Sequence, residues 1–160
     1  ISLGDIDAIR DLANIYREGN GVPKNCQESL KILLKGANDP KNDASCQYTV
    51  ALMYQTGEGN VKSNLKKAYE FYLKSAEQGF IQSQINVGNF LRVGCGCKVD
   101  IVAAVGWIEK ASIQGDMHGQ LCLGTCYFNG EGVEQSNNKA FQWYLRAAQQ
   151  GLAEAQFCAA

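Results

Sequence analysis

Four cysteines form the densest group of side chains that could bind a metal ion or carry out redox chemistry. Cys95 and Cys97 flank a glycine, and Cys122 and Cys126 are one helical turn apart. Four thiolates can hold zinc tetrahedrally, but neither Cys-x-Cys nor Cys-x3-Cys is a common spacing of structural zinc ligands. Cys126 also falls in a column of core residues, so we interpret it as a small buried hydrophobe. We therefore predict no cofactor, and a zinc or redox protein is the alternative.

Two Ser-x-x-Lys sequences could place an amine beside a hydroxyl nucleophile. They are Ser63 with Lys66, and Ser136 with Lys139, and each stands at the start of an expected helix. Penicillin-recognising enzymes use such a dyad, but the Ser-Asp-Asn and Lys-Thr-Gly sequences that accompany it there do not occur in this chain. Serine is also favoured at helix starts. We predict a chain without catalytic activity, and a hydrolase of the penicillin-recognising type is an alternative.

Two other features have chemical interpretations that the sequence does not favour. His118 is the only histidine, so no histidine metal set can be built, and we expect it on the surface at a helix start. Paired glycines occur four times, but none continues into Gly-x-Gly-x-x-Gly or a P-loop. We interpret these glycines as turns.

Composition limits the partners. The 160 residues carry a formal net charge of −1, without the positive surface that binds nucleic acid, so a helical-repeat RNA binder is a lesser alternative. The uncharged apolar stretches are shorter than a membrane span requires, so we expect no direct membrane insertion. Seven cysteines, an odd number, and no Asn-x-Ser/Thr sequence favour a cytoplasmic location, although the parent protein could be secreted or lumenal.

An internal repeat organises the whole chain. Glycine doublets recur at intervals of 38, 37 and 36 residues, and three residues before each stands a large side chain, in three cases tyrosine. The next column upstream is always small. The doublets are Gly19/Gly21, Gly57/Gly59, Gly94/Gly96 and Gly130/Gly132. The large residues are Tyr16, Tyr54, Leu91 and Tyr127, and the small residues are Ala13, Ala51, Gly88 and Gly124.

Each repeat contains two segments in which apolar residues recur every three or four positions, which predicts helices. We expect helices over residues 5–18, 25–38, 43–56, 64–78, 81–93, 99–114, 117–129 and 136–150, with a ninth beginning near 153. Residues able to cap a helix precede the second segments: Asn25, Asn64, Asp100 and Ser136. Glycine closes three of the repeats at Gly79, Gly115 and Gly151, and Pro40 takes that place in the first.

The small column predicts where two helices approach closely, because alanine or glycine removes the side chain that would separate them. One helix pair is too small to bury its apolar face, so neighbouring pairs must stack. We predict an all-α fold: a right-handed α/α superhelical solenoid of about four helix pairs. The chain lacks an initial methionine and ends within the pattern, so we expect a fragment of a larger protein.

The repeated columns resemble the Sel-one-like repeat (SLR) family, a relative of the tetratricopeptide repeat. The fourth unit matches best, through Leu123-Gly124, Tyr127, Gly130-Glu131-Gly132-Val133, Lys139-Ala140, Trp143-Tyr144 and Gln150-Gly151. The resemblance implies one solenoid over residues 1–160, with repeats near 5–42, 43–80, 81–116 and 117–152 and a further repeat starting in 153–160. It also implies a scaffold or adaptor that binds other proteins.

The first helix of each pair commonly lines the concave side of such a solenoid. The residues on the non-core face of these helices are polar and nearly uncharged after the first repeat. They are Asp11, Asn14, Glu18, Thr49, Leu52, Thr56, Asn86, Asn89, Val93, Cys122, Thr125 and Asn129. Asparagine both donates and accepts hydrogen bonds, so this surface suits an extended segment of a partner protein. We predict partner binding at Asn14, Thr49, Leu52, Asn86, Asn89, Cys122, Thr125 and Asn129.

Overall fold

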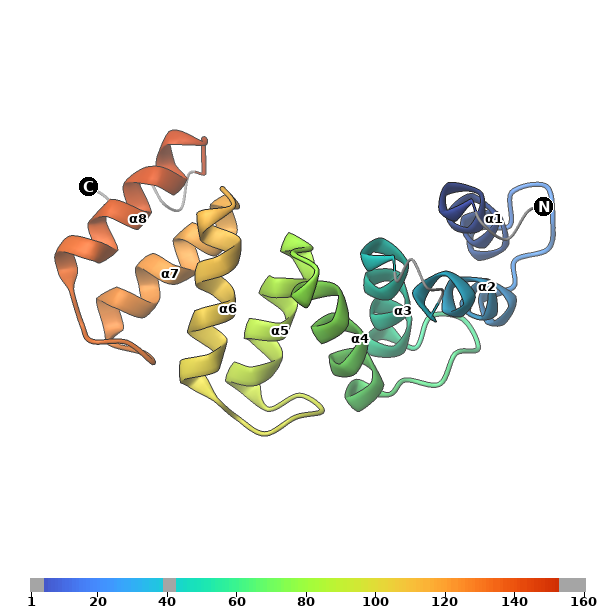
Figure 1. Cartoon of the computed structure of the whole chain (residues 1–160), viewed down its shortest axis with the longest axis horizontal. Helices are drawn as coiled ribbons and strands as arrows, with labels where there is room; N and C mark the ends of the chain where they lie inside the picture. The colour runs from blue at the N-terminus through green and yellow to red at the C-terminus, as the bar shows by residue number, and fades with distance from the viewer. Residues whose placement is uncertain (1–4, 39–42, 153–160) are drawn as a thin grey trace. The chain divides into compact units, whose positions relative to one another are not determined.

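The computed structural model of the chain describes residues 5–38 and 43–152, and within these ranges it contains helices, turns and loops but no strand. Eight helices of 13 residues follow one another in these described ranges: α1 (Ile6–Glu18), α2 (Cys26–Asn38), α3 (Ala44–Thr56), α4 (Leu65–Glu77), α5 (Ile81–Val93), α6 (Ile101–Ile113), α7 (Met117–Asn129) and α8 (Asn137–Gln149) (Figure 1). The all-α prediction of four helix pairs is therefore confirmed. The expected ninth helix and Pro40 lie outside the described residues.

The helix ends agree with the sequence prediction to within two residues. The largest difference is at α6, which begins at Ile101 rather than at residue 99. Asp100 has an extended backbone, with φ −147°, and its carboxylate accepts a hydrogen bond from the Ala103 amide at 2.9 Å. This residue is therefore the cap before the helix, and the expected range began too early because it counted the cap and the loop as helix.

The predicted residues cap the N-terminal ends of the second helices. The side chains of Asn25, Asn64 and Ser136 each accept a hydrogen bond from the amide three residues later, at 3.0, 3.0 and 3.4 Å. The closing glycines have positive φ, as at Gly115 with φ 96°. The last residue before each glycine is a glutamine, as at Gln114, and its side chain turns back into the protein as described below.

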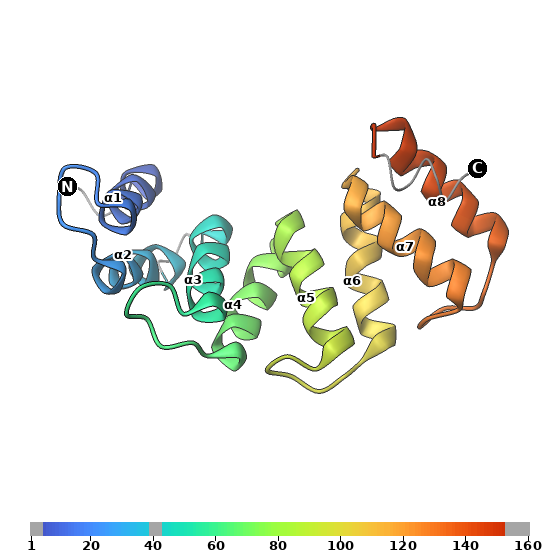
Figure 2. The ribbon, with the colours of Figure 1, turned by 180° about the vertical axis from the view of Figure 1, so that it is seen from behind.

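The described helices divide between two compact units, residues 1–80 and 81–160. In the first unit, α1 packs on α2, α2 on α3, and α3 on α4; in the second, α5 packs on α6, α6 on α7, and α7 on α8. Figure 2 shows the same helices from behind. The second helix of one repeat thus also packs against the first helix of the next repeat within the same unit.

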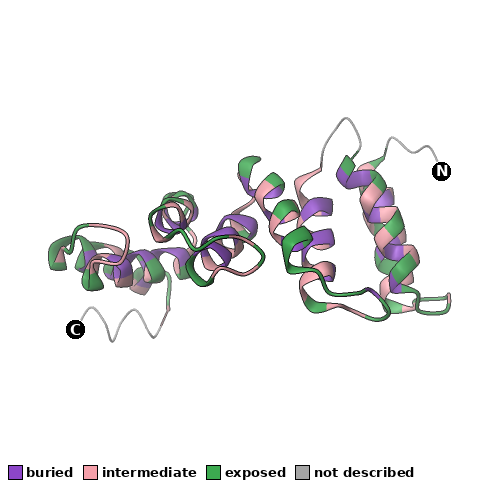
Figure 3. Cartoon of the chain, turned by 90° about the horizontal axis from the view of Figure 1, so that it is seen from below, coloured by how far each residue is buried: buried purple, intermediate pink, exposed green. Residues whose placement is uncertain are grey.

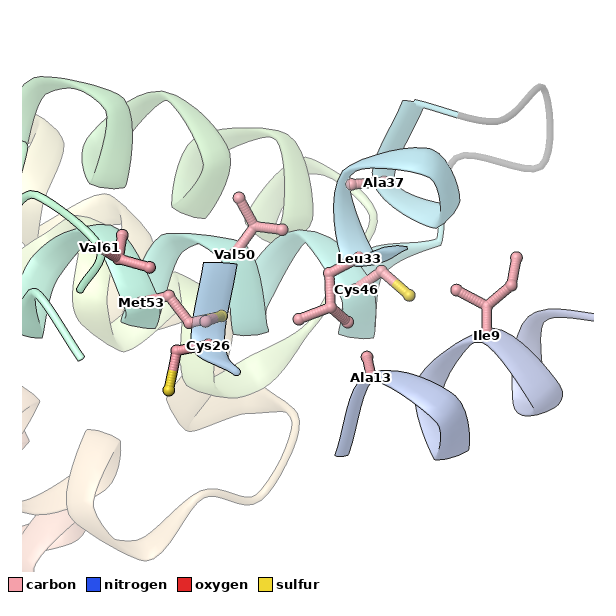
Figure 4. Close-up of a cluster of buried hydrophobic side chains, with 9 residues drawn as sticks. All are labelled: Ile9, Ala13, Cys26, Leu33, Ala37, Cys46, Val50, Met53 and Val61. Carbon is pink, nitrogen blue, oxygen red and sulfur yellow. The ribbon is translucent and has the colours of Figure 1, made fainter. Parts of the chain in front are cut away.

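Each unit buries the apolar stripes that the sequence periodicity predicted. In the first unit, Ala13, Leu33 and Met53 from three successive helices are at most 2% exposed and belong to one cluster (Figure 4). Purple stretches in Figure 3 mark the buried faces of the helices. None of the helices in the described ranges has the length and apolar character needed to cross a membrane.

The small column is the place of closest helix approach, as predicted. A Cβ atom added to Gly88 would lie 2.8 Å from Cγ1 of Ile108, and one added to Gly124 would lie 2.6 Å from the ring of Tyr144. Carbon atoms in contact are normally about 3.5–4.0 Å apart. A larger side chain at these positions would therefore force a neighbouring side chain to move, because α5 approaches α6 closely and α7 approaches α8 closely.

A buried column of glutamines was not predicted from the sequence. Gln47 is fully buried, and Gln84 and Gln120 are 3% and 5% exposed. The glutamine that ends each repeat donates to the buried one through its side chain: Gln78 to Gln47 at 2.7 Å, Gln114 to Gln84 at 2.8 Å, and Gln150 to Gln120 at 2.9 Å.

The first repeat lacks this pair of glutamines. Ile9, 5% exposed, takes the place of the buried glutamine, and the sequence there has no closing Gln-Gly. The buried glutamine and the glutamine that ends the repeat therefore occur together or not at all, as expected for a buried amide that needs a hydrogen-bond partner.

Candidate functional site

The predicted partner-binding residues and their neighbours on the same helix faces, which we call the row, lie on the first helices of the repeats in both units. In the first unit, Asn14 on α1 is exposed, and Thr49 and Leu52 on α3 are half-buried. In the second unit, Asn86 and Asn89 on α5 are half-buried. On α7, Cys122 and Asn129 are exposed, and Thr125 is half-buried.

Three of the predicted residues meet at a recess of about 140 Å³ in the second unit. They are Asn89 from α5 and Cys122 and Thr125 from α7. The other lining residues are Arg92, Ile108, Leu121, Cys126 and Glu131. The recess is therefore mainly apolar, with one cation and one anion in its lining. We call it the α5–α7 recess.

Helical spacing and close packing position these side chains. Asn89 and Arg92 are three residues apart, and so lie on one face of α5. Leu121 and Thr125 stand four apart on α7 and share a face in the same way. The absence of a side chain at Gly88 allows α6 to approach α5 closely, and Ile108 of α6 lines the recess together with residues of the two first helices.

The thiols of this region are poor nucleophiles. Desolvation raises the pKa of Cys126 to about 11, with a further contribution from Glu131. Desolvation also raises the pKa of Cys122, although the nearby Arg92 acts in the opposite direction. Burial and the neighbouring Cys95 raise the pKa of Cys97. These thiols are protonated near neutral pH, whereas nucleophilic attack requires a thiolate.

Cys126 is 4% exposed and belongs to the core of the second unit, as the sequence predicted. Cys95 and Cys97 are half-buried. In the described part of the chain, no three histidine, cysteine or acidic side chains gather where they could hold a metal ion.

Both Ser-x-x-Lys pairs have other partners. The Ser63 hydroxyl donates to the carbonyl of Gln55 at 3.2 Å, which ties the loop to the end of α3. The Ser136 hydroxyl caps α8. The ammonium of Lys139 lies 5.1 Å from the centre of the Tyr127 ring. These contacts give the serines structural roles at turns and helix starts.

Lys62, Lys66, Lys67 and Lys74 form a basic region at and before α4, and two of them pack against aromatic rings. Lys67 lies over Tyr54 and Lys74 over Phe71, each with its ammonium 5.2 Å from the ring centre. Such cation–π contacts stabilise exposed pairs by about 0.5–1 kcal/mol. Lys62 and the dyad lysine Lys66 are exposed.

The hydrogen-bonding capacity of the row differs between threonine and asparagine. Thr49 and Thr125 each donate a hydroxyl hydrogen bond, 3.0 Å long, to the carbonyl four residues earlier in their own helix. Among residues 5–38 and 43–152, no hydrogen bond involves the carboxamides of Asn86 and Asn89. The asparagines therefore hold the free donor and acceptor groups of this surface in the second unit.

Sequence reasoning did not identify Arg92, Ile108, Leu121 or Glu131 as part of this surface. A comparison of repeat columns contains a usable signal. Cys126 is the smallest member of a column whose other members are Ile15, Met53 and Phe90, so a space is expected beside it.

Comparisons with known proteins place this arrangement among helical repeat proteins. The family model described as Sel1 repeat matches residues 6–39, 44–80, 81–116 and 119–152. Chitin synthase regulator SKT5 of Saccharomyces cerevisiae is 32% identical over 118 residues, which cover 71% of this chain and 17% of that protein.

Two solved structures are similar over nearly the whole chain. A Sel1 repeat protein from Oxalobacter formigenes is 29% identical with a TM-score of 0.91, covering 97% of this chain and 63% of that one. A protective antigen of uropathogenic Escherichia coli, described as having an SLR fold, is 32% identical with a TM-score of 0.89, covering 95% of this chain and 32% of that one. The chain thus spans less than two thirds of each of these three proteins.

Proposed function

The chain belongs to the Sel1 repeat family, and from this premise we propose that it is a non-catalytic adaptor whose first helices bind an extended segment of a partner protein. The observation that carries the proposal is the convergence of Asn89, Cys122 and Thr125 on one recess. A recess with apolar and polar lining is the usual form of a recognition site.

The free carboxamides extend this surface along α5. Asn86 precedes Asn89 by three residues, so both lie on one helix face. Each can donate to a peptide carbonyl and accept from a peptide amide. An extended partner segment offers both groups at every residue, and supplies the hydrogen bonds that the two asparagines do not make within the described ranges.

The chemistry of the other candidate groups also favours binding over catalysis. The Cys122 and Cys126 thiols have raised pKa values, and the Ser136 hydroxyl is engaged as a helix cap. The relative from Saccharomyces cerevisiae is named as a regulator of chitin synthase, which is consistent with an adaptor role. The location of this chain is proposed to be cytoplasmic on the basis of its cysteine content.

The test is a double substitution, Asn86→Ala with Asn89→Ala, compared with Lys74→Ala as the control. Partners would be captured with the wild-type chain, identified by mass spectrometry, and titrated against each purified variant. The double variant should bind a direct partner more weakly, because each lost hydrogen bond contributes about 0.5–1.5 kcal/mol. Lys74→Ala, on the second helix of its repeat, should bind as the wild type does.

Circular dichroism would verify that both variants keep the helical content of the wild type. Binding should also change little with salt, because the row carries little charge. Partner binding that depends only on residues 62–74 and falls steeply with salt would refute the proposal. Turnover of a penicillin or tight RNA binding by the wild-type chain would support one of the alternative functions instead.

A further inference from the structure

We propose that the α5–α7 recess is an anchor site for one aliphatic side chain of an extended peptide segment, of leucine or methionine size, with Asn89, Arg92 and Glu131 contacting the segment's backbone. This inference rests on the proposed function and specifies the chemistry of the partner at one site.

The size of the recess sets the size of the side chain. Its volume of about 140 Å³ is close to the roughly 150 Å³ of an apolar protein cavity that holds a single benzene ring. A leucine or methionine side chain is of a size to occupy this space, and an indole is larger than either. Ile108, Leu121 and Cys126 line it with carbon and sulfur, so the burial of an apolar side chain there is favourable.

The charges of the recess point to a backbone rather than to a charged side chain. Arg92 and Glu131 both belong to the lining, and a formal charge on the ligand would be attracted by one and repelled by the other. A peptide backbone has no net charge but offers a carbonyl acceptor for Arg92 and an amide donor for Glu131. Asn89 can serve either group.

The equivalent place in the first unit is organised differently. Arg17 and Glu58 occupy the columns of Arg92 and Glu131, and they form an ion pair of 3.7 Å between Nε and Oε1. In the second unit, no ion pair joins Arg92 to Glu131 within the described ranges. The two charged groups of the recess are therefore available to an incoming segment.

The first unit carries a larger residue than Cys126 at the equivalent core position. Met53 stands in the column of Cys126 and is fully buried in the first core cluster. Tyr48 stands in the column of Leu121, but its ring packs against α4, 5.8 Å from the ring of Tyr72, centre to centre. The recess of the second unit therefore lies beside Cys126, the smallest side chain of a column that otherwise carries Ile15, Met53 and Phe90.

Disulfide exchange at Cys122 provides a direct test, because this exposed thiol lines the recess. The full chain would be equilibrated with symmetric disulfides of N-acetyl-leucine, N-acetyl-alanine and N-acetyl-tryptophan cysteamide in the presence of 2-mercaptoethanol. The exchange is run to equilibrium at alkaline pH, because the pKa of Cys122 is raised. Attack of the Cys122 thiolate forms a mixed disulfide and releases one cysteamide thiolate. Mass spectrometry of the Cys122 peptide gives the fraction modified by each probe.

We expect the leucine probe to be retained at Cys122 at least fivefold more strongly than the alanine probe, and the tryptophan probe no better than alanine. Cys95, which does not line the recess, should show no such preference in the same sample. Cys126→Met introduces the residue of the first unit and should fill the recess. This variant should reduce the leucine preference to below twofold.

Thr125→Leu enlarges another lining residue, introduces the residue that Leu52 supplies in the same column of the first unit, and keeps the test decisive if Cys126→Met does not fold. Equal retention of leucine and alanine at Cys122, or a leucine preference that survives both filling variants, would overturn the inference. Preference for the tryptophan probe would do so as well. The outcome is independent of partner capture: loss of partner binding in the Asn86/Asn89 variant with no leucine preference would support the proposed function while refuting the anchor site.

Discussion

Replacing Gly124 with alanine tests the close contact between α7 and α8. The added Cβ would lie 2.6 Å from both Cδ1 and Cε1 of Tyr144 and 3.3 Å from the carbonyl oxygen of Ala140. The Tyr144 ring would have to move by roughly 1 Å to restore a normal carbon–carbon contact. This ring is 6% exposed, and its hydroxyl donates to Thr125 Oγ1 at 3.3 Å, so the movement disturbs packing and a hydrogen bond together.

Gly106→Ala is the matched control. Gly106 lies within α6, and a Cβ added there meets no atom within 4 Å. Both substitutions gain helix propensity of about 0.8–1.0 kcal/mol, but only Gly124→Ala incurs the overpacking cost of about 1–3 kcal/mol. Gly106→Ala should therefore be slightly more stable than the wild type, and Gly124→Ala between equally stable and about 2 kcal/mol less stable.

Thermal unfolding followed by circular dichroism would compare the three proteins. With about 2–4 °C of Tm for each kcal/mol in a chain of this size, the two variants should differ by about 2–12 °C, with Gly106→Ala the more stable. The combination of Gly124→Ala with Tyr144→Leu should show a smaller effect of the alanine, because the ring that it contacts is gone. Equal Tm values for Gly124→Ala and Gly106→Ala would refute the assignment of a tight contact at Gly124.

Three further outcomes are expected. Gln47→Leu should lower the free energy of unfolding, measured with urea, by about 1–3 kcal/mol. The substitution removes the side-chain amide that donates to the Ala37 carbonyl at 3.1 Å and leaves this buried acceptor without that partner. An effect below about 0.5 kcal/mol would argue against a structural role for the Gln47 side chain. Asp100→Ala should cost about 0.5–2 kcal/mol through loss of the α6 cap, whereas an unchanged Tm would show that the cap contributes little. Burial raises the pKa of Cys46 from 9.0 to about 12, so the unfolded chain loses this proton at lower pH than the folded chain does. The free energy of unfolding should therefore fall as the pH rises from about 9 to about 12. Cys46→Ala should show a shallower fall, and a pH profile identical to that of the wild type would contradict the burial of this thiol.

The sequence alone was sufficient for the helices, their ends and the repeat. Periodic apolar residues, cap side chains such as Asp100, and glycines that adopt positive φ act through neighbours a few positions away, so their spacing can be read directly along the chain. The small column could also be recognised from the sequence. Gly88 and Gly124 indicate where two helices approach closely, because a glycine has no side chain to separate them. These features are local or repeated, and repetition makes each of them visible several times.

Only the tertiary structure decided where free space and free hydrogen-bonding groups lie. The α5–α7 recess depends on side chains from three helices and a loop, and on the difference in volume between Cys126 and the methionine of the equivalent column. The glutamine pairs join residues about 30 positions apart, and the threonine hydroxyls of the predicted row bond to their own helices. The volume left between packed side chains, and the partner that each polar group finds, depend on all neighbours at once, so the pattern of one segment does not determine them.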